Sequence, residues 1–191
     1  MEAFPQSTIV NNVVPWGTSG WTRTLRVDTT PPDEMTREYF VKDCDAEVAE
    51  AMFQGEFHSL HKMHSLMPTL CPKPHGWGEY QNTAGTFFLV MDFLHLTTKS
   101  PDPVGTARLV SSLHKKTYGT SPNMLFGFDV PTWHGKIVQP NTWDANWSEF
   151  FTKLITIFYN EDMKANGHFP EYETAFMAIK DRVIPRLLGA L

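Results

Sequence analysis

Apolar and polar residues alternate along the first part of the chain in a pattern that predicts strands, and the pattern then changes to a helical period. Residues 21–29 are rich in β-branched and aromatic types, and a turn at 30–33 separates them from a second strand-like run at 39–42. Apolar residues then recur at helical spacing over about 47–67, and Pro68 ends that helix. The pattern predicts two antiparallel strands followed by one amphipathic helix.

Two more strands are predicted after this helix. Residues 76–80 form a short strand-like run, 81–85 have turn chemistry, and 86–91 are almost continuously apolar, as in a buried strand. Strands, one helix and further strands follow each other in this order in the small lobe of a protein kinase, and 92–94 would then be the hinge to a second lobe. We therefore predict an α+β, protein-kinase-like fold with an antiparallel sheet in its small lobe.

The chain after residue 96 is predicted to be mainly helical. Residues 97–103 are polar and contain prolines, as in a linker, and a helix at about 104–118 is expected to carry Ala107, Val110 and Leu113 inward.

The strongest helical signal lies further on. Its apolar residues recur at i, i+3, i+4, i+7, i+8 and i+11, and they are Trp147, Phe150, Phe151, Leu154, Ile155 and Phe158. Asn166 and Gly167 supply a C-cap, and another helix is predicted at 171–183, after which Pro185 interrupts the helical structure. The helices after Trp143 are expected to leave apolar faces partly exposed.

One charged residue falls inside the apolar stripe of the helix predicted at 47–67. At about 100° per residue, Glu56 projects into the same sector as Phe53 and Leu60. A carboxylate there needs a buried partner, because burying an unpaired charge costs several kcal/mol. Lys42, at the end of the second strand, is the expected partner, although the spacing alone fits equally well with two groups that never meet. Kinases hold a lysine on nucleotide phosphates with such a glutamate.

A loop of small residues precedes Lys42 and lies between two strand-like segments. It reads Trp16-Gly17-Thr18-Ser19-Gly20-Trp21, and kinases place a glycine-rich loop over the phosphates, which its backbone N–H groups bind. Many hairpins carry two glycines, and this loop does not follow the G-x-G-x-x-G pattern. Both interpretations stay open at this point.

Composition places the chain among globular proteins. Of its 191 residues, 41% are hydrophobic and 13% aromatic, which suffices for a packed core. A formal net charge of −5 and the lack of a basic run argue against nucleic acid as a partner. The first ten residues lack the pattern of a signal peptide, and no stretch approaches the roughly 18 apolar residues of a membrane span. We expect a cytoplasmic protein with no membrane partner, and two cysteines without a Cys-x-x-Cys pair fit a reducing compartment.

Histidines and tryptophans suggest two alternative sites. Three histidines follow each other at i, i+3 spacing, and they are His58, His61 and His64. Such steps fan the side chains over about 120°, and no nearby residue completes a tetrahedral set, so we interpret them as a solvated face and predict no metal site. Three tryptophans are able to stack a sugar or a base, and they are Trp133, Trp143 and Trp147. Large aromatics at this spacing are usually part of the core, which is the interpretation we favour.

Beyond these features, several segments resemble the fructosamine kinase family, the ketosamine 3-kinases, in a fungal-type form. In chain order the matching segments are Ser19-Gly20-Trp21-Thr22, Tyr39-Phe40-Val41-Lys42, Met52–Phe57, Pro72-Lys73-Pro74, Phe88–Phe93, Leu113-His114, Phe126-Gly127-Phe128, Gln139–Trp143 and Val183–Leu188. Each segment is modest alone, and their order makes the resemblance specific.

The resemblance implies an aminoglycoside phosphotransferase-like fold, ATP with Mg²⁺ as phosphoryl donor, and the 3-hydroxyl of a ketosamine as acceptor. Substrates would be glycated proteins or small ketosamines, and the role would be protein deglycation. By position, Lys42 would contact the phosphates, Glu56 would orient Lys42, and Met91 would be the gatekeeper beside the adenine. The other implied nucleotide-binding residues are Gly17, Ser19 and Gly20 of the loop, with backbone groups of Asp92 and Leu94 at the adenine edge.

The sequence departs from the family in the second lobe. The family's catalytic loop, of His-Gly-Asp-Leu-Trp-x-Gly-Asn type, follows the Arg-Leu-Leu helix, and the chain stops at Leu191. We therefore predict no catalytic residue and no Mg²⁺ ligand, and expect a truncated gene model, a splice form or a pseudokinase. Because phosphoryl transfer depends on positioning and on charge neutralisation by metal, we expect no activity from this chain alone.

The predicted organisation has three parts. They are an N-terminal segment 1–12, a complete small lobe with the hinge at 13–96, and an incomplete helical large lobe at 97–191. The function by family is that of an ATP-dependent fructosamine or ribulosamine 3-kinase. The alternative is a non-catalytic nucleotide-binding or protein-interaction module, and a small helical metal protein built on the histidines is a third possibility.

Overall fold

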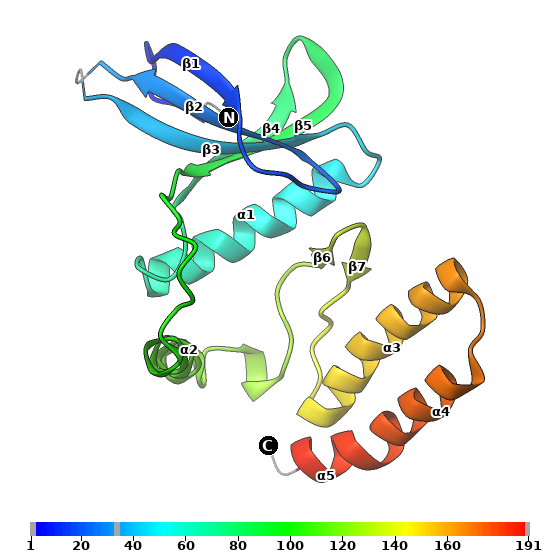
Figure 1. The fold of residues 1–191 in the computed structure, drawn as a ribbon. Coiled ribbons are helices and arrows are strands. Elements are labelled where there is room, and N and C mark those ends of the chain that lie inside the picture. Colours follow the sequence, from blue (N-terminus) through cyan, green and yellow to red (C-terminus); the bar gives the residue numbers. More distant parts are fainter. Residues whose placement is uncertain (1–2, 33–34, 190–191) are drawn as a thin grey trace. The chain divides into compact units, whose positions relative to one another are not determined.

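A computed structural model describes residues 3–32 and 35–189 of the chain. The chain divides into two compact units, Met1–Lys116 and Thr117–Leu191, called here the first and the second unit (Figure 1). Each unit is described by itself.

A five-stranded antiparallel sheet forms the body of the first unit as far as the structure describes it. Its strands are β1 (Ile9–Pro15), β2 (Arg23–Thr30), β3 (Arg37–Cys44), β4 (Pro74–Tyr80) and β5 (Thr83–Asp92), in the spatial order β1-β2-β3-β5-β4. The strands predicted around residues 21–29, 39–42, 76–80 and 86–91 are confirmed. Because β3 is central, its residues pair on both sides, and Lys42 pairs with Thr24 of β2 and Leu89 of β5.

One face of the sheet forms a hydrophobic core with the start of the chain. Its buried residues alternate along the strands, as the period of two requires, and they are Val27, Tyr39, Val41 and Val90. Ala3 and Phe4 pack against them, and the ring of Phe4 meets that of Tyr39 edge-on at 4.9 Å. The opposite face carries Lys42 and is the side that meets α1.

Helix α1 (Ala49–Leu66) connects β3 to β4 and lies along the sheet (Figure 1). It buries Met52 and Phe53, and Met67 caps its end just before Pro68, with Met67 N donating to Met63 O at 2.9 Å. The end predicted from Pro68 is therefore confirmed.

Helix α2 (Pro103–Thr117) follows β5 and has no buried residue among those described. Ala107 and Val110 are exposed and Leu113 is partly buried, so the expectation that they point into a core is wrong. The helical period predicts which residues share a face, but no described element of the first unit covers that face. Lys116 Nζ donates to Leu66 O at 2.7 Å and holds the end of α2 to the end of α1.

The second unit begins with irregular chain and a small hairpin. Its elements are the single 3₁₀ turn η1 (Pro122–Met124), β6 (Thr132–His134), β7 (Ile137–Gln139), α3 (Trp147–Asn166), α4 (Pro170–Ala178), the π turn η2 (Ile179–Val183) and α5 (Ile184–Leu188). The sequence predicts α3 and the helical stretch at 171–183 but not the hairpin, since strands of three residues are too short to show a period. Gly135 turns the hairpin with a φ of 59°.

Helix α3 covers the predicted apolar period and ends at the predicted C-cap. The side chain of Asn146 accepts a hydrogen bond from Glu149 N, and Gly167 with a φ of 86° follows the last turn. Phe150 is buried, and Tyr159 stacks on Phe176 of α4 with ring centroids 3.9 Å apart. These contacts join α3 to α4.

Pro185 does not interrupt the helix, contrary to the expectation from the sequence. Proline lacks an N–H and its ring crowds the carbonyl four residues earlier, so it normally breaks a helix. Here the wider π turn Ile179–Val183 comes first, and α5 begins with Pro185 in its first turn. The local widening admits the ring, and the chain stays helical.

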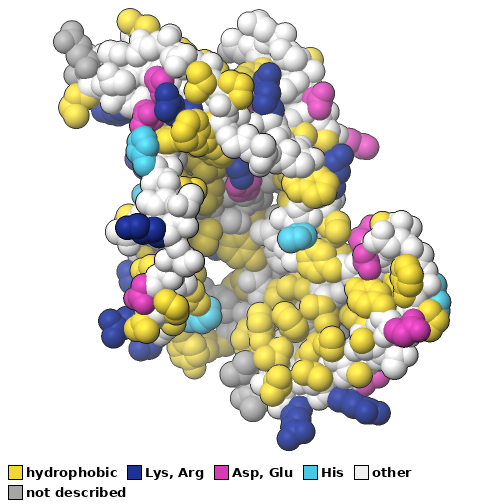
Figure 2. Space-filling view, in the orientation of Figure 1, with side chains coloured by type: hydrophobic (Ala, Val, Ile, Leu, Met, Phe, Trp, Pro, Cys, Tyr) yellow, Lys and Arg dark blue, Asp and Glu magenta, His cyan; other side chains and the backbone are white. Residues whose placement is uncertain are grey.

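Large apolar side chains remain exposed along the last helices of the second unit. Figure 2 shows hydrophobic side chains gathering over α3, α4 and α5, and the exposed ones along the chain here include Phe169, Met177, Ile179, Val183 and Leu187. The expected exposure of apolar faces after Trp143 is confirmed. Within the described ranges, no helix has both the length and the apolarity needed to cross a membrane.

Candidate functional site

The structure joins the strand lysine to the helix glutamate singled out in the sequence. Lys42 lies near the end of β3 and Glu56 in the middle of α1, and Lys42 Nζ donates to Glu56 Oε1 at 2.6 Å. Both elements belong to the packed first unit, since β3 is central in the sheet and α1 contacts β4 and β5. The predicted ion pair is confirmed.

The pair is less buried than the sequence predicts. The side chains of Lys42 and Glu56 keep 27% and 32% of their surface exposed, so the expectation of a buried pair is wrong. The apolar sector of α1 narrows along the helix, because Phe53 is fully buried whereas Leu60 and Met63 are only partly so. An ion pair with about a third of its surface exposed contributes on the order of 1 kcal/mol or less to stability. Its main effect is to orient an ammonium that solvent, and hence a ligand, can reach.

The loop from Trp16 to Trp21 joins β1 to β2 beside Lys42. Trp16 N donates to Thr24 O at 3.0 Å, and Thr24 Oγ1 donates to Trp16 O at 2.6 Å, which closes the stem of the loop. Thr24 pairs with Lys42 across the sheet, so the loop starts next to the strand position that carries the ammonium. Gly17 has a φ of +74°, which a residue with a side chain rarely adopts, and no atom lies within 4 Å of a Cβ built there.

Ser19 orders the second half of the loop from within. Its Oγ accepts hydrogen bonds from the N–H groups of Trp21 and Thr22 at 3.3 and 3.2 Å. Among the residues that the structure describes, no group accepts from the N–H groups of Thr18, Ser19 and Gly20. The loop therefore has unused backbone donors, which is the chemistry that an anionic ligand requires.

Asp92, the first hinge residue of the prediction, is tied to β4 and the segment before it. His75 Nε2 lies 2.6 Å from Asp92 Oδ1, and Lys73 N donates to Asp92 Oδ2 at 3.3 Å. Asp92 N donates to Lys73 O at 2.9 Å. Because its N–H is used, the backbone of Asp92 has at most a carbonyl to offer a ligand.

Leu94 carries the unused backbone groups of the hinge. Phe93 N donates to Glu38 O at 3.3 Å, which holds the hinge to β3. Leu94 follows and is exposed, and no described residue bonds to its N–H or its carbonyl. Met91, three residues earlier, is buried and pairs with Phe40 of β3. The hinge thus presents the free N–H and the free carbonyl of Leu94, three residues after the buried Met91 of β5.

Two further side chains lie on the Lys42 face of the sheet and were not predicted. Phe40, two residues before Lys42, pairs with Arg26 of β2 and with Met91 of β5. Alternation along β3 is a sufficient signal for Phe40, because residues two apart on a strand share a face. Arg26 requires the register of β2 against β3, which the sequence does not show.

The face of the sheet that does not carry Lys42 holds a polar cluster that links β2, β3 and β4. Arg23 donates to the buried Asp43 through NH2 at 2.6 Å and through Nε at 2.9 Å, and Tyr80 OH donates to Asp43 Oδ2 at 3.1 Å. Burial, with the nearby Asp43 charge, raises the pKa of Tyr80 to about 12. The hydrogen bond and the charge of Asp43 also raise the pKa of Arg23. The cluster faces away from Lys42, and we assign it a structural role.

The histidines predicted to form a solvated face have local partners. His64 Nδ1 lies 3.2 Å from Cys71 O, and the His61 ring stacks on Phe57 at 6.0 Å. Within residues 3–32 and 35–189, no group of three or more His, Cys, Asp or Glu is placed to hold a metal ion.

The tryptophans of the second unit are all partly buried, and the ring of Trp147 packs on Phe126, Phe150 and Phe151.

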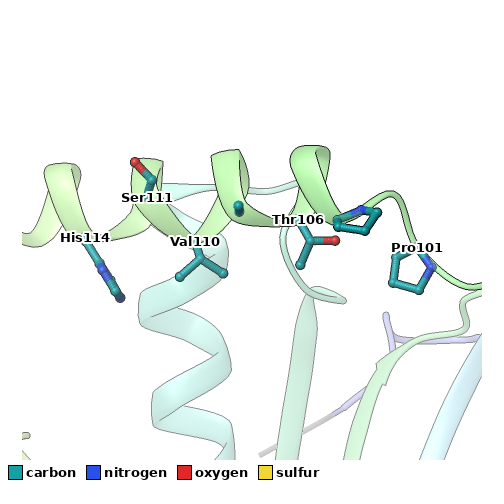
Figure 3. Close-up of a pocket in the computed structure, with 7 residues that line it drawn as sticks. Pro101, Thr106, Val110, Ser111 and His114 are labelled. Atoms are coloured by element: carbon teal, nitrogen blue, oxygen red, sulfur yellow. The ribbon is translucent and has the colours of Figure 1, made fainter.

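An open hollow of about 650 Å³ runs along α2. Thr106, Val110 and His114 point to the same side of the helix, as residues four apart should (Figure 3). Pro101 and Pro103 line its beginning. None of the predicted nucleotide-binding residues lines the hollow, so it is not part of the candidate site.

This chain is similar to a described protein family and to curated kinases of related names. Residues 24–185 match the family model described as fructosamine kinase. The chloroplastic protein-ribulosamine 3-kinase of Arabidopsis thaliana is 29% identical over 113 residues, which cover 59% of this chain and 33% of that protein. The protein of the same name from Oryza sativa subsp. indica is 29% identical over 115 residues, which cover 60% of this chain and 32% of its own. The chain spans about a third of the length of these curated relatives.

Solved structures share the fold. A Thermobifida fusca chain assigned as a fructosamine-3-kinase superposes with a TM-score of 0.63 at 21% identity, covering 90% of this chain and 57% of that one. A chain from Haemophilus somnus with the same assignment gives 0.56 at 22% identity, covering 76% and 45%. At this identity the likeness concerns the fold alone. The α+β, protein-kinase-like fold expected from the sequence is confirmed.

Proposed function

The chain belongs to the fructosamine kinase family, and from this premise we propose that its first unit binds ATP through the Lys42 face of the sheet. The observation that carries the proposal is the contact of 2.6 Å between Lys42 and Glu56 beneath the loop that joins β1 to β2. A half-exposed ammonium held by a helix carboxylate has the charge, the orientation and the accessibility that a phosphate requires.

The loop would supply the remaining phosphate contacts. The N–H groups of Thr18, Ser19 and Gly20 lack partners among the described residues, and successive free N–H groups form an anion-binding concavity. Ser19 fixes the loop from inside through Trp21 and Thr22, so little loop entropy would be lost on binding. These groups would hold the phosphates by position and charge, which is the main contribution of a protein to phosphoryl transfer.

The base would lie at the hinge. Leu94 carries a free N–H and a free carbonyl, and the edge of adenine offers the complementary acceptor and donor. Asp92 would contribute only its carbonyl, because Lys73 accepts its N–H. Met91 would form the wall at the inner end of the base, since it is buried at the end of β5.

We propose ketosamines, on glycated proteins or as small molecules, as the substrates of the whole protein, in the manner that the names of the ribulosamine 3-kinases state for those relatives. Magnesium is implied by the resemblance. The described residues hold no group of three or more carboxylates, histidines or cysteines able to bind it, so no residue of this chain is assigned to the metal. The sequence also contains no His-Gly-Asp segment, and no proton acceptor is assigned.

ATP binding is tested with the variant Lys42→Met. We expect ATP to raise the melting temperature of the wild-type chain, because a ligand that binds only the folded state stabilises it by mass action. Lys42→Met should weaken ATP binding at least about tenfold by calorimetric titration, since one charge-assisted phosphate contact is worth about 1.5–3 kcal/mol. Glu56→Gln should have a smaller effect in the same direction.

The matched control is Lys62→Met, the same substitution at an exposed lysine of α1. It should leave the ATP affinity unchanged. Equal ATP affinities for Lys42→Met and wild type would contradict the proposed site.

A non-catalytic nucleotide-binding module is the second candidate function. It needs only the ion pair of Lys42 with Glu56 and the loop with unused N–H groups, and both lie in the first unit. Incubation of the chain with ATP, Mg²⁺ and a fructosyl-lysine substrate separates the two functions. We expect binding without phosphate transfer from this chain alone, and transfer above background would identify it as an active kinase.

A further inference from the structure

Three side chains stack where the loop after β1 meets the hinge. Trp16, directly before Gly17, meets the ring of Phe93 edge-on, with centroids 5.1 Å apart and planes at 72°. The guanidinium carbon of Arg26 lies 5.3 Å from the centre of the Trp16 ring and 5.9 Å from that of Phe93. Edge-to-face and cation–π contacts both attract, because the positive edge of one ring, or a cation, faces the negative face of the other ring. The stem of the loop is thereby fixed to the hinge by side chains.

The charge of Arg26 is satisfied within the sheet. Its Nε lies 3.0 Å from Asp28 Oδ1, and its NH1 lies 3.7 Å from Glu38 Oε1. His95 Nε2 lies 2.7 Å from Glu38 Oε2, and Asn12 Nδ2 donates to Asp28 Oδ2 at 3.2 Å, so both carboxylates are held as well. With two acidic groups around it, this guanidinium is a poor site for a phosphate. Its role is to hold the aromatic ring above it.

Trp16 is therefore immobilised and accessible at once. The residue keeps 45% of its surface exposed, although its backbone is bonded to Thr24 and its ring contacts Arg26 and Phe93. A rigid, half-exposed indole suits a planar partner, because stacking on it gains contact area without the cost of ordering the side chain. The free donor and acceptor at Leu94 lie one residue after Phe93, so a base bound there is within reach of the indole.

We propose that Trp16 stacks the base of the bound nucleotide and that Arg26 is the positioning residue that fixes the indole for it. The proposal rests on the nucleotide site proposed above and adds a specificity determinant to it. A purine offers a larger stacking face than a pyrimidine. The site should accordingly prefer purine nucleoside triphosphates, and the preference should depend on Trp16.

The test compares three probes, ATP, CTP and inorganic tripolyphosphate, by calorimetric titration of the full 191-residue chain. Trp16→Ala should weaken ATP binding about tenfold and CTP binding less, because stacking of a base on an aromatic side chain has roughly this value. Tripolyphosphate, which has no base, should bind Trp16→Ala and wild type equally. Trp16→Phe keeps an aromatic face and should restore ATP affinity to within about threefold of wild type.

Trp21→Ala is the matched control. Trp21 is the same residue type at the other end of the loop, is 55% exposed and makes no ring contact with any described residue. This variant should bind ATP and CTP in the wild-type ratio. The guanidinium of Arg26 is tested separately with Arg26→Met, which keeps an apolar side chain. This variant should lower the affinity for ATP about threefold in the wild-type background. It should have no further effect on that affinity in the Trp16→Ala background.

Two results separate this proposal from the proposed function. If wild type binds neither ATP nor tripolyphosphate, the nucleotide site fails and the base-stacking role fails with it. If wild type binds ATP and Trp16→Ala binds it equally well, only the role of Trp16 is refuted. Equal losses of ATP and tripolyphosphate affinity in Trp16→Ala would also refute it, because the residue would then act through the folding of the loop. Should Trp16→Ala fail to fold, Trp16→Leu against Trp16→Phe decides in the same way.

Discussion

The two units of the chain differ in how much of their own apolar surface they bury. Of the fourteen buried hydrophobic residues among those described, eleven lie in the first unit, and only Phe150, Phe176 and Ile184 lie in the second. A sheet with a helix on one face and the chain start on the other closes a core by itself. Helices α3, α4 and α5 bury one residue each and leave other apolar side chains in water. The candidate nucleotide site accordingly lies in the unit that supports itself.

The largest expected difference between the units comes from removing one phenylalanine from each. Phe53→Ala, at a residue with 0% exposure in α1, should lower the free energy of unfolding by about 3–5 kcal/mol. Phe169→Ala, at a residue 53% exposed before α4, should change it by less than about 0.5 kcal/mol. Urea unfolding, with hydrogen exchange followed at amides of the sheet for Phe53→Ala and of α3 and α4 for Phe169→Ala, measures both. Similar losses in the two variants would contradict the difference in burial.

A smaller effect tests whether the second unit is loosely packed throughout. A Cβ on Gly127 would lie 2.7 Å from Trp143 Cε3 and 3.0 Å from Asn141 O, so Gly127→Ala should cost about 2 kcal/mol through overpacking. At Gly20 in the first unit an added Cβ meets nothing within 4 Å, and Gly20→Ala should be within about 0.5 kcal/mol of wild type. If Gly127→Ala unfolds like wild type, this part of the second unit adjusts freely, and the contrast between the units is larger than the burial indicates.

The smallest effect concerns the polar cluster of the first unit and appears only at high pH. Because the pKa of Tyr80 is raised to about 12 in the folded chain from 10.0, the folded state keeps a proton that the unfolded state loses. Stability should fall as the pH rises from about 10 to about 12, by on the order of 1 kcal/mol after allowance for the partial exposure of Tyr80. Tyr80→Phe should remove this fall. A pH titration of urea unfolding measures it, and an unchanged pH profile in Tyr80→Phe would show that the fall has another source.

Much of the first unit follows from local rules. The end of α1 is set by Pro68, and the strands follow from β-branched and aromatic runs separated by turns. The ion pair of Lys42 and Glu56 could also be predicted from a local rule, since a charge within an apolar stripe requires a partner. How far the pair is buried could not be predicted. The width of the apolar sector at Glu56 depends on tertiary neighbours, which the helical period does not identify.

The features that the sequence does not show depend on the register between strands, or on whether another element packs over an apolar helix face. Arg26 faces Phe40 only through the pairing of β2 with β3, and its stacking on Trp16 needs the path of the loop. The hairpin of β6 and β7 is too short for a period. The helix α2 has an apolar face of the expected kind, but periodicity cannot say whether another element covers Val110. Long-range geometry decided each of these cases.

The π turn before Pro185 also sets the rotational phase of the helix that follows it. Phe176 and Ile184 are both buried, yet eight residues at about 100° each place two side chains of an uninterrupted α-helix about 80° apart. A π turn closes over one residue more than an α turn, so the segment Ile179–Val183 takes up part of this angle and brings both residues to the same side. The length of these five residues is thereby constrained as strictly as their composition. A single insertion or deletion there would rotate the end of the chain by about a quarter of a turn.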